Sequence, residues 1–527
     1  ILTELPKILP DTEIWLGGPE VTYDGPGLLR EFPQVTGIMV GEGEVTFREV
    51  LEQYLREAET AGQSEQQPES DSTEHQVADR RGTVAGKSMV ERFGQIPGLC
   101  LASGYTAPRD LTDLTTLPFL YEDMEPFTNR IIYYETSRGC PYRCSYCLSS
   151  IDKKVRLRDI SVVKRELQFF LDQNVKQVKF IDRTFNCDHK HAMEIWRYIY
   201  EHDNGVTNFH FEISADILRE EEIALLNRFR PGLAQLEIGV QSTNTDTIRE
   251  IRRTMRLEEV REHVARIKEK GNIHQHLDLI AGLPYEDIKS FRKSFDDVYS
   301  MRPDQLQLGF LKVLKGSYMQ EMQQEYELRY KDEPPYEVLS TKWLPYSDVI
   351  ELKGIEEMVE IYYNSGQFTH VVEALVKNYA SAYQMYQDLW QYYEEHDYMG
   401  IQHRRSARYE IVLDFVKEKY PEQADVMREL LTYDYYLREN AKSRPEFAGE
   451  DATDKRFVRA FYEEEEKERK HLPGYEQFDR NQMRKMTHLE YFPHMGKMLL
   501  FDYKFRNPLN QEARTCMIKK DSLERRG

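Results

Sequence analysis

Residues 135–150 read ETSRGCPYRCSYCLSS and bring together three of the six cysteines of the chain. Cys140, Cys144 and Cys147 follow the spacing C-x3-C-x2-C, and Tyr146 directly precedes the last of them. Three thiolates on one short loop can hold three corners of an iron–sulfur cubane, because soft sulfur ligands suit iron. No fourth cysteine follows nearby, so one iron of such a cluster would keep an open position that can bind a substrate or a cofactor.

A structural zinc site is the alternative interpretation of this loop. Zinc requires four ligands, usually in two pairs. The nearest further candidates are Cys187, His189 and His191, which lie beyond a predicted strand and helix. The spacing therefore favours an iron–sulfur cluster over zinc.

The loop lies near the start of a core, residues 129–316, in which strand and helix patterns alternate. The predicted strands are 131–135, 177–182, 208–213, 234–241, 273–281 and 305–312. The predicted helices between them are 161–173, 188–202, 219–229, 245–269 and 286–301. Strands that are separated by helices pair in parallel through crossover connections. The sequence therefore predicts an α/β fold with a parallel sheet.

The two faces of the predicted strands differ in polarity. One face is apolar, with Phe209, Phe211, Ile213, Leu236, Ile238, Val240, Leu277, Leu279, Leu306, Leu308 and Phe310. The other is polar, with His210, Glu212, Ser214, Gln235, Glu237, Gln241, His274, His276, Asp278, Gln305 and Gln307. A sheet covered on both faces would show continuous apolar runs, and a closed eight-stranded barrel fills its interior with branched apolar side chains. We therefore expect an incomplete, open barrel with a polar concavity.

The first segment, residues 1–55, has the pattern of half a doubly wound domain. Strands are expected at 13–16 and 37–40, each followed by a glycine-rich turn, and a helix follows the second. Loops at the carboxyl ends of parallel strands are where such sheets bind ligands, although ordinary turns remain the alternative. The candidate binding glycines are Gly17, Gly18, Gly41 and Gly43.

The remaining segments show no catalytic motif. Residues 56–92 are rich in Glu, Gln and Ser and predict a disordered linker or a surface insertion. Residues 93–128 are punctuated by prolines and predict a connector laid along a neighbouring surface. Residues 317–527 are tyrosine-rich with helical spacing, and we expect an all-α C-terminal domain with one strand-like piece near its end, at 498–503.

Composition limits the class of protein. The formal net charge of −20 argues against a general nucleic-acid-binding surface. No apolar run approaches the roughly 18 residues that span a membrane, no signal peptide is visible, and the scattered cysteines do not form a disulfide framework. We therefore expect a cytoplasmic protein without membrane partners. The chain opens with Ile1 rather than Met, so we expect a further N-terminal segment in the full-length protein.

The cysteine motif, placed on the loop after the first core strand, resembles the signature of radical S-adenosylmethionine (SAM) enzymes. The resemblance implies a [4Fe–4S] cluster on Cys140, Cys144 and Cys147, whose open iron is chelated by the amino and carboxylate groups of SAM. It implies reductive cleavage of SAM to a 5′-deoxyadenosyl radical. It also implies a six-stranded partial (β/α) barrel, a small-molecule substrate and an electron donor such as flavodoxin or ferredoxin.

Further stretches resemble family members that carry cobalamin-binding domains. These stretches are FIDRTFN (180–186), FHFEISAD (209–216), LEIGVQS (236–242) and LIAGLPYED (279–287). By that resemblance, the candidates to contact SAM are Tyr146, Asp182, Glu212, Gln241 and Ser242. Residues 15–22 and 40–51 resemble the second half of a truncated, Rossmann-like cobalamin-binding domain. The first half, which could supply a histidine to cobalt, is missing, so cobalamin is expected only if that half is present.

The leading hypothesis is thus a radical SAM enzyme of the cobalamin-associated group, with methyl transfer and radical rearrangement both open and the substrate unnamed. The C-terminal domain resembles one of unknown function found on a group of these proteins. A non-enzymatic protein that an iron–sulfur or zinc site only stabilises is the second hypothesis. A transfer-RNA-modifying radical enzyme is a third, and the net charge of −20 weighs against it.

Overall fold

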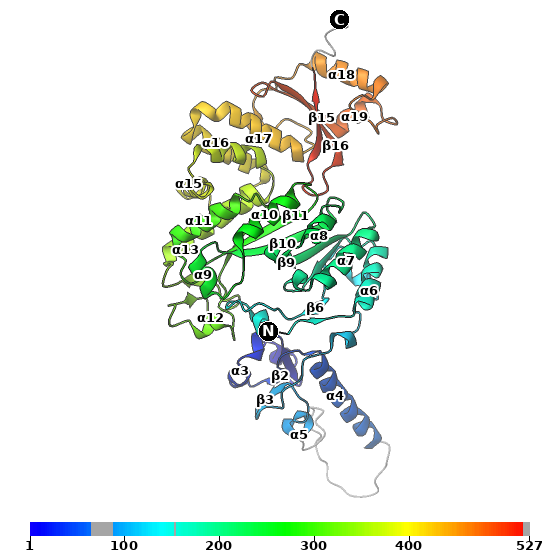
Figure 1. Ribbon diagram of the computed structural model, residues 1–527, viewed down its shortest axis with the longest axis vertical. Helices are drawn as coiled ribbons and strands as arrows, with labels where there is room; N and C mark the ends of the chain where they lie inside the picture. The colour runs from blue at the N-terminus through cyan, green and yellow to red at the C-terminus, as the bar shows by residue number, and fades with distance from the viewer. Residues whose placement is uncertain (65–87, 152–153, 520–527) are drawn as a thin grey trace.

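In the computed structural model, which describes residues 1–64, 88–151 and 154–519, a parallel sheet lies at the centre of the molecule (Figure 1). Its six strands are β5 (Ile132–Tyr134), β8 (Gln177–Phe180), β9 (Asn208–Ile213), β10 (Ala234–Gln241), β11 (His274–Ala281) and β12 (Gln305–Phe310). Their order across the sheet is β12-β11-β10-β9-β8-β5, and every neighbouring pair is parallel. The predicted parallel α/β core is confirmed.

Helices alternate with these strands along the chain. They are α6 (Ile160–Asp172), α7 (His189–Glu201), α8 (Glu220–Leu226), α9 (Thr245–Glu250), α10 (Leu257–Lys268) and α11 (Ile288–Tyr299). Aspartates cap several of them: Asp159, Asp188 and Asp287 each accept a hydrogen bond from a backbone N–H of the first turn. The single helix expected at 245–269 is wrong, because residues 251–256 break it and Arg252 has a φ of 55°.

The polarity of the strand faces agrees with the burial of the side chains. Phe211, Leu236 and Leu277 are fully buried and belong to one continuous apolar cluster. On the other face, a carboxylate oxygen of Glu237 lies 3.1 Å from the Lys179 ammonium nitrogen and 2.9 Å from a ring nitrogen of His210. The core therefore has an apolar, helix-covered side and a side where polar groups contact one another.

A small N-terminal lobe lies next to the sheet (Figure 1). It contains β1 (Ile14–Gly17), β2 (Val35–Met39), β3 (Leu99–Leu101) and β4 (Gly104–Tyr105), with α2 (Pro19–Thr22), α3 (Gly25–Glu31), α4 (Glu44–Ser64) and α5 (Met89–Phe93). The strands β1 and β2 are parallel, and the connector adds β3 and β4 in antiparallel pairing. The expected linker is wrong for residues 56–64, which continue α4. It is also wrong for residues 89–92, which belong to α5, and residues 65–87 lie outside the described residues.

The C-terminal part is mostly helical. Its longer helices are α13 (Tyr346–Val359), α14 (Thr369–Leu375), α15 (Ala382–Glu395), α16 (Arg405–Lys419), α17 (Ala424–Arg438), α18 (Lys455–Glu468) and α19 (Arg480–Met486). The strands here are β13 (Arg329–Tyr330), β14 (Val338–Ser340), β15 (Thr487–Phe492), β16 (Lys497–Arg506) and β17 (Ala513–Ile518). The last three strands form an antiparallel sheet.

The all-α expectation for this domain is therefore wrong. The strand-like piece at 498–503 lies within β16, but charged residues concealed the rest of the terminal sheet, where two carboxylates are buried. Glu490 and Asp502 are each 2% exposed and are paired with Arg444 and Arg514. Paired charges can occupy buried strand positions, so a highly charged sequence does not exclude a sheet.

None of the described helices combines the length and the apolar character needed to cross a membrane.

Candidate functional site

The cysteine loop begins and ends in a short antiparallel ribbon. Strand β6 (Ser137–Arg138) precedes the cysteines and β7 (Arg156–Leu157) follows them, with Arg138 directly opposite Arg156. The loop is fixed to the core by a hydrogen bond of 2.9 Å from the Ser145 backbone N–H to the Ile251 carbonyl. The ribbon therefore anchors the base of the loop, and the turn after α9 anchors its tip.

The three cysteines line one cavity, which we call the cysteine pocket, of about 170 Å³. Cys140 and Cys144 are 8% and 7% exposed, Cys147 is partly exposed, and no disulfide joins any of them. The Cys140 sulfur lies 3.5 Å from the Thr184 hydroxyl. The structure thus brings the three predicted metal ligands to one place, next to the sheet's polar face.

Arg253 reaches the cysteine pocket from the turn between α9 and α10. Its Nη1 donates a hydrogen bond to the Tyr146 hydroxyl at 3.3 Å and lies 3.8 Å from the Cys144 sulfur, and its Nη2 donates to the Gly239 carbonyl. Burial raises the pKa of the Cys144 thiol, while the charge of Arg253 opposes that rise. Arg253 is therefore the cation that favours a thiolate in this pocket.

Three of the predicted SAM contacts line the cysteine pocket. They are Tyr146, Glu212 and Gln241. Burial, together with the charge of Glu237, raises the pKa of Glu212 to about 7. Gln241 has a φ of 73° at a register shift of β10, and its buried amide oxygen has no hydrogen-bond partner among the described residues. A buried acceptor without a partner costs free energy, so the Gln241 amide oxygen marks a place where a ligand could donate a hydrogen bond.

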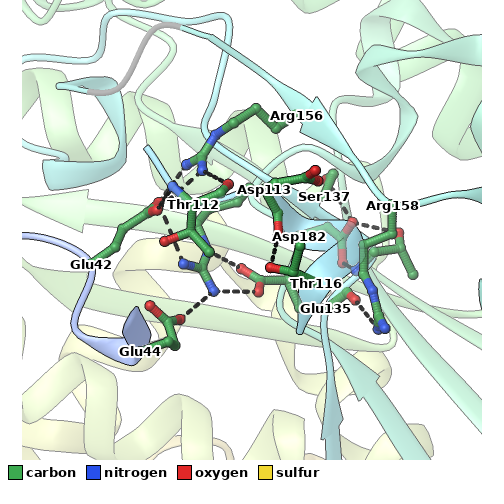
Figure 2. Close-up of polar contacts among 12 residues, drawn as sticks. Glu42, Glu44, Thr112, Asp113, Thr116, Glu135, Ser137, Arg156, Arg158 and Asp182 are labelled. Carbon is green, nitrogen blue, oxygen red and sulfur yellow. Dashed lines mark hydrogen bonds and ion pairs between the residues drawn. The ribbon is translucent and has the colours of Figure 1, made fainter. Parts of the chain in front are cut away.

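The other two predicted SAM contacts, Asp182 and Ser242, lie outside the cysteine pocket. Asp182 is 1% exposed and accepts hydrogen bonds from the Thr136 hydroxyl and the Ser137 hydroxyl, both at 2.6 Å (Figure 2). Burial raises its pKa to about 6 despite those bonds. Ser242 donates to Glu286 at 2.6 Å. Both side chains hold strand ends in place, and neither lines the cysteine pocket or the larger cavity beside it.

That larger cavity, of about 930 Å³, lies between the N-terminal lobe and the sheet, and we call it the junction cavity. Gln241, Asp278, Tyr146 and Cys147 line it from the sheet and the cysteine loop, and Gly41 lines it from the lobe. The other predicted binding glycines, Gly17, Gly18 and Gly43, are not among its described lining residues. None of the described lining residues is a histidine.

The residues of the cysteine pocket fit an iron–sulfur cluster better than a single ion. Among the described residues, no group of three His, Cys, Asp or Glu side chains could hold one metal ion. A cubane places each cysteine on a different iron, so its ligands need not converge on one point. Three thiols around one cavity, with a cation beside one of them, match that requirement.

Sequence reasoning missed Arg253 and Arg183, both of which line the cysteine pocket. Arg183 follows Asp182 within FIDRTFN (180–186), a stretch that the sequence analysis named, so its position could have been used to predict it as a site residue. Arg253 carried no such signal. It lies in the break of an expected helix, and only the tertiary fold brings it to Cys144.

Comparisons with known proteins give two family matches and several relatives. Residues 134–298 match the family described as the radical SAM superfamily, and residues 324–507 match a protein family of unknown function, DUF4080. The chain is 27% identical over 300 residues to 2-(S-pantetheinyl)-carbapenam-3-carboxylate methyltransferase of Streptantibioticus cattleyicolor, covering 54% of this chain and 40% of that protein. It is 25% identical over 308 residues to the cobalamin-dependent radical SAM methyltransferase TokK of Streptomyces tokunonensis, with the same two shares.

Among solved structures, the radical SAM methyltransferase TsrM of Kitasatospora setae, with a tryptophan substrate and a SAM analogue bound, gives a TM-score of 0.48 at 17% identity. The alignment covers 64% of this chain and 63% of that one. The chain spans 40% of the length of each of the two curated relatives described above.

Proposed function

We propose, from the membership of residues 134–298 in the radical SAM superfamily, that the chain holds a [4Fe–4S] cluster on Cys140, Cys144 and Cys147 and cleaves SAM reductively. One observation carries the proposal: the three cysteines of the motif line a single pocket, which shares Tyr146, Cys147 and Gln241 with the junction cavity. A cluster in this pocket would supply the electron that cleaves the sulfonium and an open iron that binds SAM.

The chain's own residues would then bind and orient SAM. Glu212, with a pKa near 7, is ionised in a substantial fraction at neutral pH and can accept hydrogen bonds from an ammonium group. The Gln241 amide oxygen can accept another. Arg253 donates to Tyr146 and so fixes the aromatic ring beside Cys147.

We further propose methyl transfer as the reaction class, with a small-molecule substrate in the junction cavity. Two curated relatives are methyltransferases, and one of them is cobalamin-dependent. A corrinoid in the junction cavity would be held by loop contacts such as those at Gly41, since no described lining residue could supply an imidazole to cobalt. Cobalamin belongs to the proposal because one of these relatives is described as cobalamin-dependent.

The domain boundaries follow the same proposal. The parallel sheet and its helices, residues 129–316, would be the partial barrel of the radical SAM fold. Residues 1–55, extended by the connector 93–128, would be part of a Rossmann-like cobalamin-binding domain, and residues 317–527 would form a separate C-terminal domain.

Product analysis tests the reaction. The reconstituted protein would be incubated anaerobically with SAM and a strong reductant, and 5′-deoxyadenosine and S-adenosylhomocysteine would be quantified. We expect 5′-deoxyadenosine from the wild type and none from Cys144→Ala. S-adenosylhomocysteine in the presence of cobalamin would support methyl transfer. A loaded cluster that yields neither product would instead favour a structural role for the cluster.

A further inference from the structure

The ribbon at the base of the cysteine loop places two like charges opposite each other. Arg138 in β6 and Arg156 in β7 are register partners in an antiparallel pair. Like charges directly across such a pair destabilise it. Since Arg138 is two residues before Cys140, a ribbon that splays apart would displace the first ligand of the cluster. The ribbon therefore requires an anion between the two arginines.

Glu42 supplies that anion from a different lobe. It belongs to the turn that follows β2, and Figure 2 shows it pointing toward Arg156. Arg156 donates to both carboxylate oxygens of Glu42, one of them at 3.1 Å. The Nη1 of Arg138 lies 3.4 Å from the same carboxylate. One residue of the N-terminal lobe thus contacts both strands of the ribbon.

The surrounding groups hold Glu42 in that position. The Thr112 backbone N–H donates to Glu42 at 2.7 Å, and the Thr112 carbonyl accepts from Arg156 at 2.7 Å. Gly41 has a φ of 77°, a conformation that L side chains rarely adopt, and this turn carries the chain from β2 to Glu42. Burial opposes the ionisation of Glu42, but the hydrogen bonds from Arg156 and Thr112 and the charge of Arg138 lower its pKa to about 2.

Arg138 has two further carboxylate partners. Its Nη2 lies 2.8 Å from Glu135 and 2.8 Å from Glu44, the first residue of α4. The N-terminal lobe therefore reaches Arg138 twice, through Glu42 and through Glu44. Figure 2 shows Glu42, Glu44 and Glu135 within one group of polar contacts.

We propose that Glu42 is a positioning residue for the iron–sulfur cluster, and that Glu42, Arg138 and Arg156 form a clasp through which the N-terminal lobe sets the geometry of the cysteine loop. The part that concerns the cluster rests on the proposed function. The turn around Gly41, which is expected to bind a cofactor, would thus also hold the cysteine loop of the neighbouring domain. The lobe is then part of the cluster site whether or not a corrinoid is present.

The first test uses the chain without its cluster. Glu42→Gln removes the carboxylate charge but keeps the size of the side chain. We expect amide hydrogen exchange at residues 136–138 and 156–158 to accelerate about tenfold, because charge-assisted hydrogen bonds to the ribbon are lost. The matched control is Glu13→Gln, which breaks an ion pair of 2.7 Å with Arg92 inside the lobe. The control should leave exchange at the ribbon unchanged.

The second test uses the reconstituted protein. The rate at which a ferrous chelator removes iron should rise about tenfold in Glu42→Gln and should stay at the wild-type value in Glu13→Gln. The conservative variant Glu42→Asp, which keeps the carboxylate, should release iron more slowly than Glu42→Gln.

The outcomes separate the two claims. Faster exchange together with faster iron release supports the clasp. Unchanged exchange at the ribbon, or faster exchange with unchanged iron release, overturns it as a positioning device. A wild-type chain that binds no cluster would contradict the proposed function, and the exchange experiment would still decide whether Glu42 holds the ribbon.

Discussion

The sheet core meets its two neighbours in different ways. Toward the C-terminal helices the junction is mainly apolar: Phe295 of α11 contacts the rings of Tyr383 and Tyr386 of α15, with ring centroids 5.6 and 5.9 Å apart. Arg292 of α11 adds an ion pair of 2.8 Å with Glu351 of α13. One apolar cluster runs from Ile132 in the sheet to Ala448 beyond α17. Toward the N-terminal lobe the junction is crossed by ion pairs, those of Glu42 and one of 2.7 Å between Lys315 and Glu20.

The two junctions contribute in different ways, one mainly to the stability of the fold and the other mainly to the orientation of side chains. Apolar burial is strong and non-directional, so it joins the core and the helices without fixing fine positions. Ion pairs and charge-assisted hydrogen bonds contribute less net stability, but they fix the relative orientation of the groups that they join. The ion-paired junction is the one that contacts the cysteine loop, where orientation decides whether a cluster can be held. The following predictions test this difference between the two junctions.

The largest effect is expected at the apolar junction. Phe295→Ala removes a fully buried ring and should lower the free energy of unfolding by about 3–5 kcal/mol. Denaturant unfolding measures this, and Phe295→Leu is the matched control with a much smaller loss. A loss below about 1 kcal/mol for Phe295→Ala would show that the helices are not packed as one body with the core.

A smaller effect is expected at the ion-paired junction. Arg156→Gln removes the bidentate partner of Glu42 and should lower the free energy of unfolding by about 2 kcal/mol, because hydrogen bonds to charged groups contribute roughly this much. The same denaturant experiment applies. A loss as large as that of Phe295→Ala would erase the proposed difference between the junctions.

The polar site should also respond to pH. Because burial raises the pKa of Glu212 to about 7, its carboxylate is charged above that pH and neutral below it. SAM carries an ammonium and a sulfonium, so its affinity should rise as pH increases through 7 and fall below it. Calorimetric titration from pH 6 to 8 checks this, and Glu212→Gln should give a flat profile. A wild-type affinity independent of pH would remove Glu212 from the site.

The smallest effect is expected for Glu44→Gln at the outer edge of the clasp. The side chain of Glu44 is 40% exposed, and exposed ion pairs contribute about 0–1 kcal/mol. Thermal unfolding should therefore change little, and iron release should stay within about twofold of the wild type. A tenfold acceleration would assign the positioning role to Glu44 rather than Glu42.

Much of the core was predictable from local pattern. The alternation along 208–213 and 234–241 identified both the strands and their polar face, and the spacing of Cys140, Cys144 and Cys147 singled out three side chains that line one pocket. The contacts between distant segments were not predictable. Nothing in the sequence near Glu42 indicates Arg156, 114 positions away, and nothing near Arg253 indicates Cys144. Asp182 and Ser242 follow strands as ligand-binding residues do, but their partners Thr136 and Glu286 are revealed only by the fold.

The central claim is that Cys140, Cys144 and Cys147 hold a cluster with an open iron that binds SAM. Electron paramagnetic resonance of the anaerobically reconstituted and reduced protein, recorded before and after SAM is added, tests it most directly. We predict the signal of a reduced [4Fe–4S] cluster that changes when SAM is added and is lost in Cys144→Ala. A protein without a cluster signal, or a signal that SAM and the substitution both leave unchanged, would contradict the account.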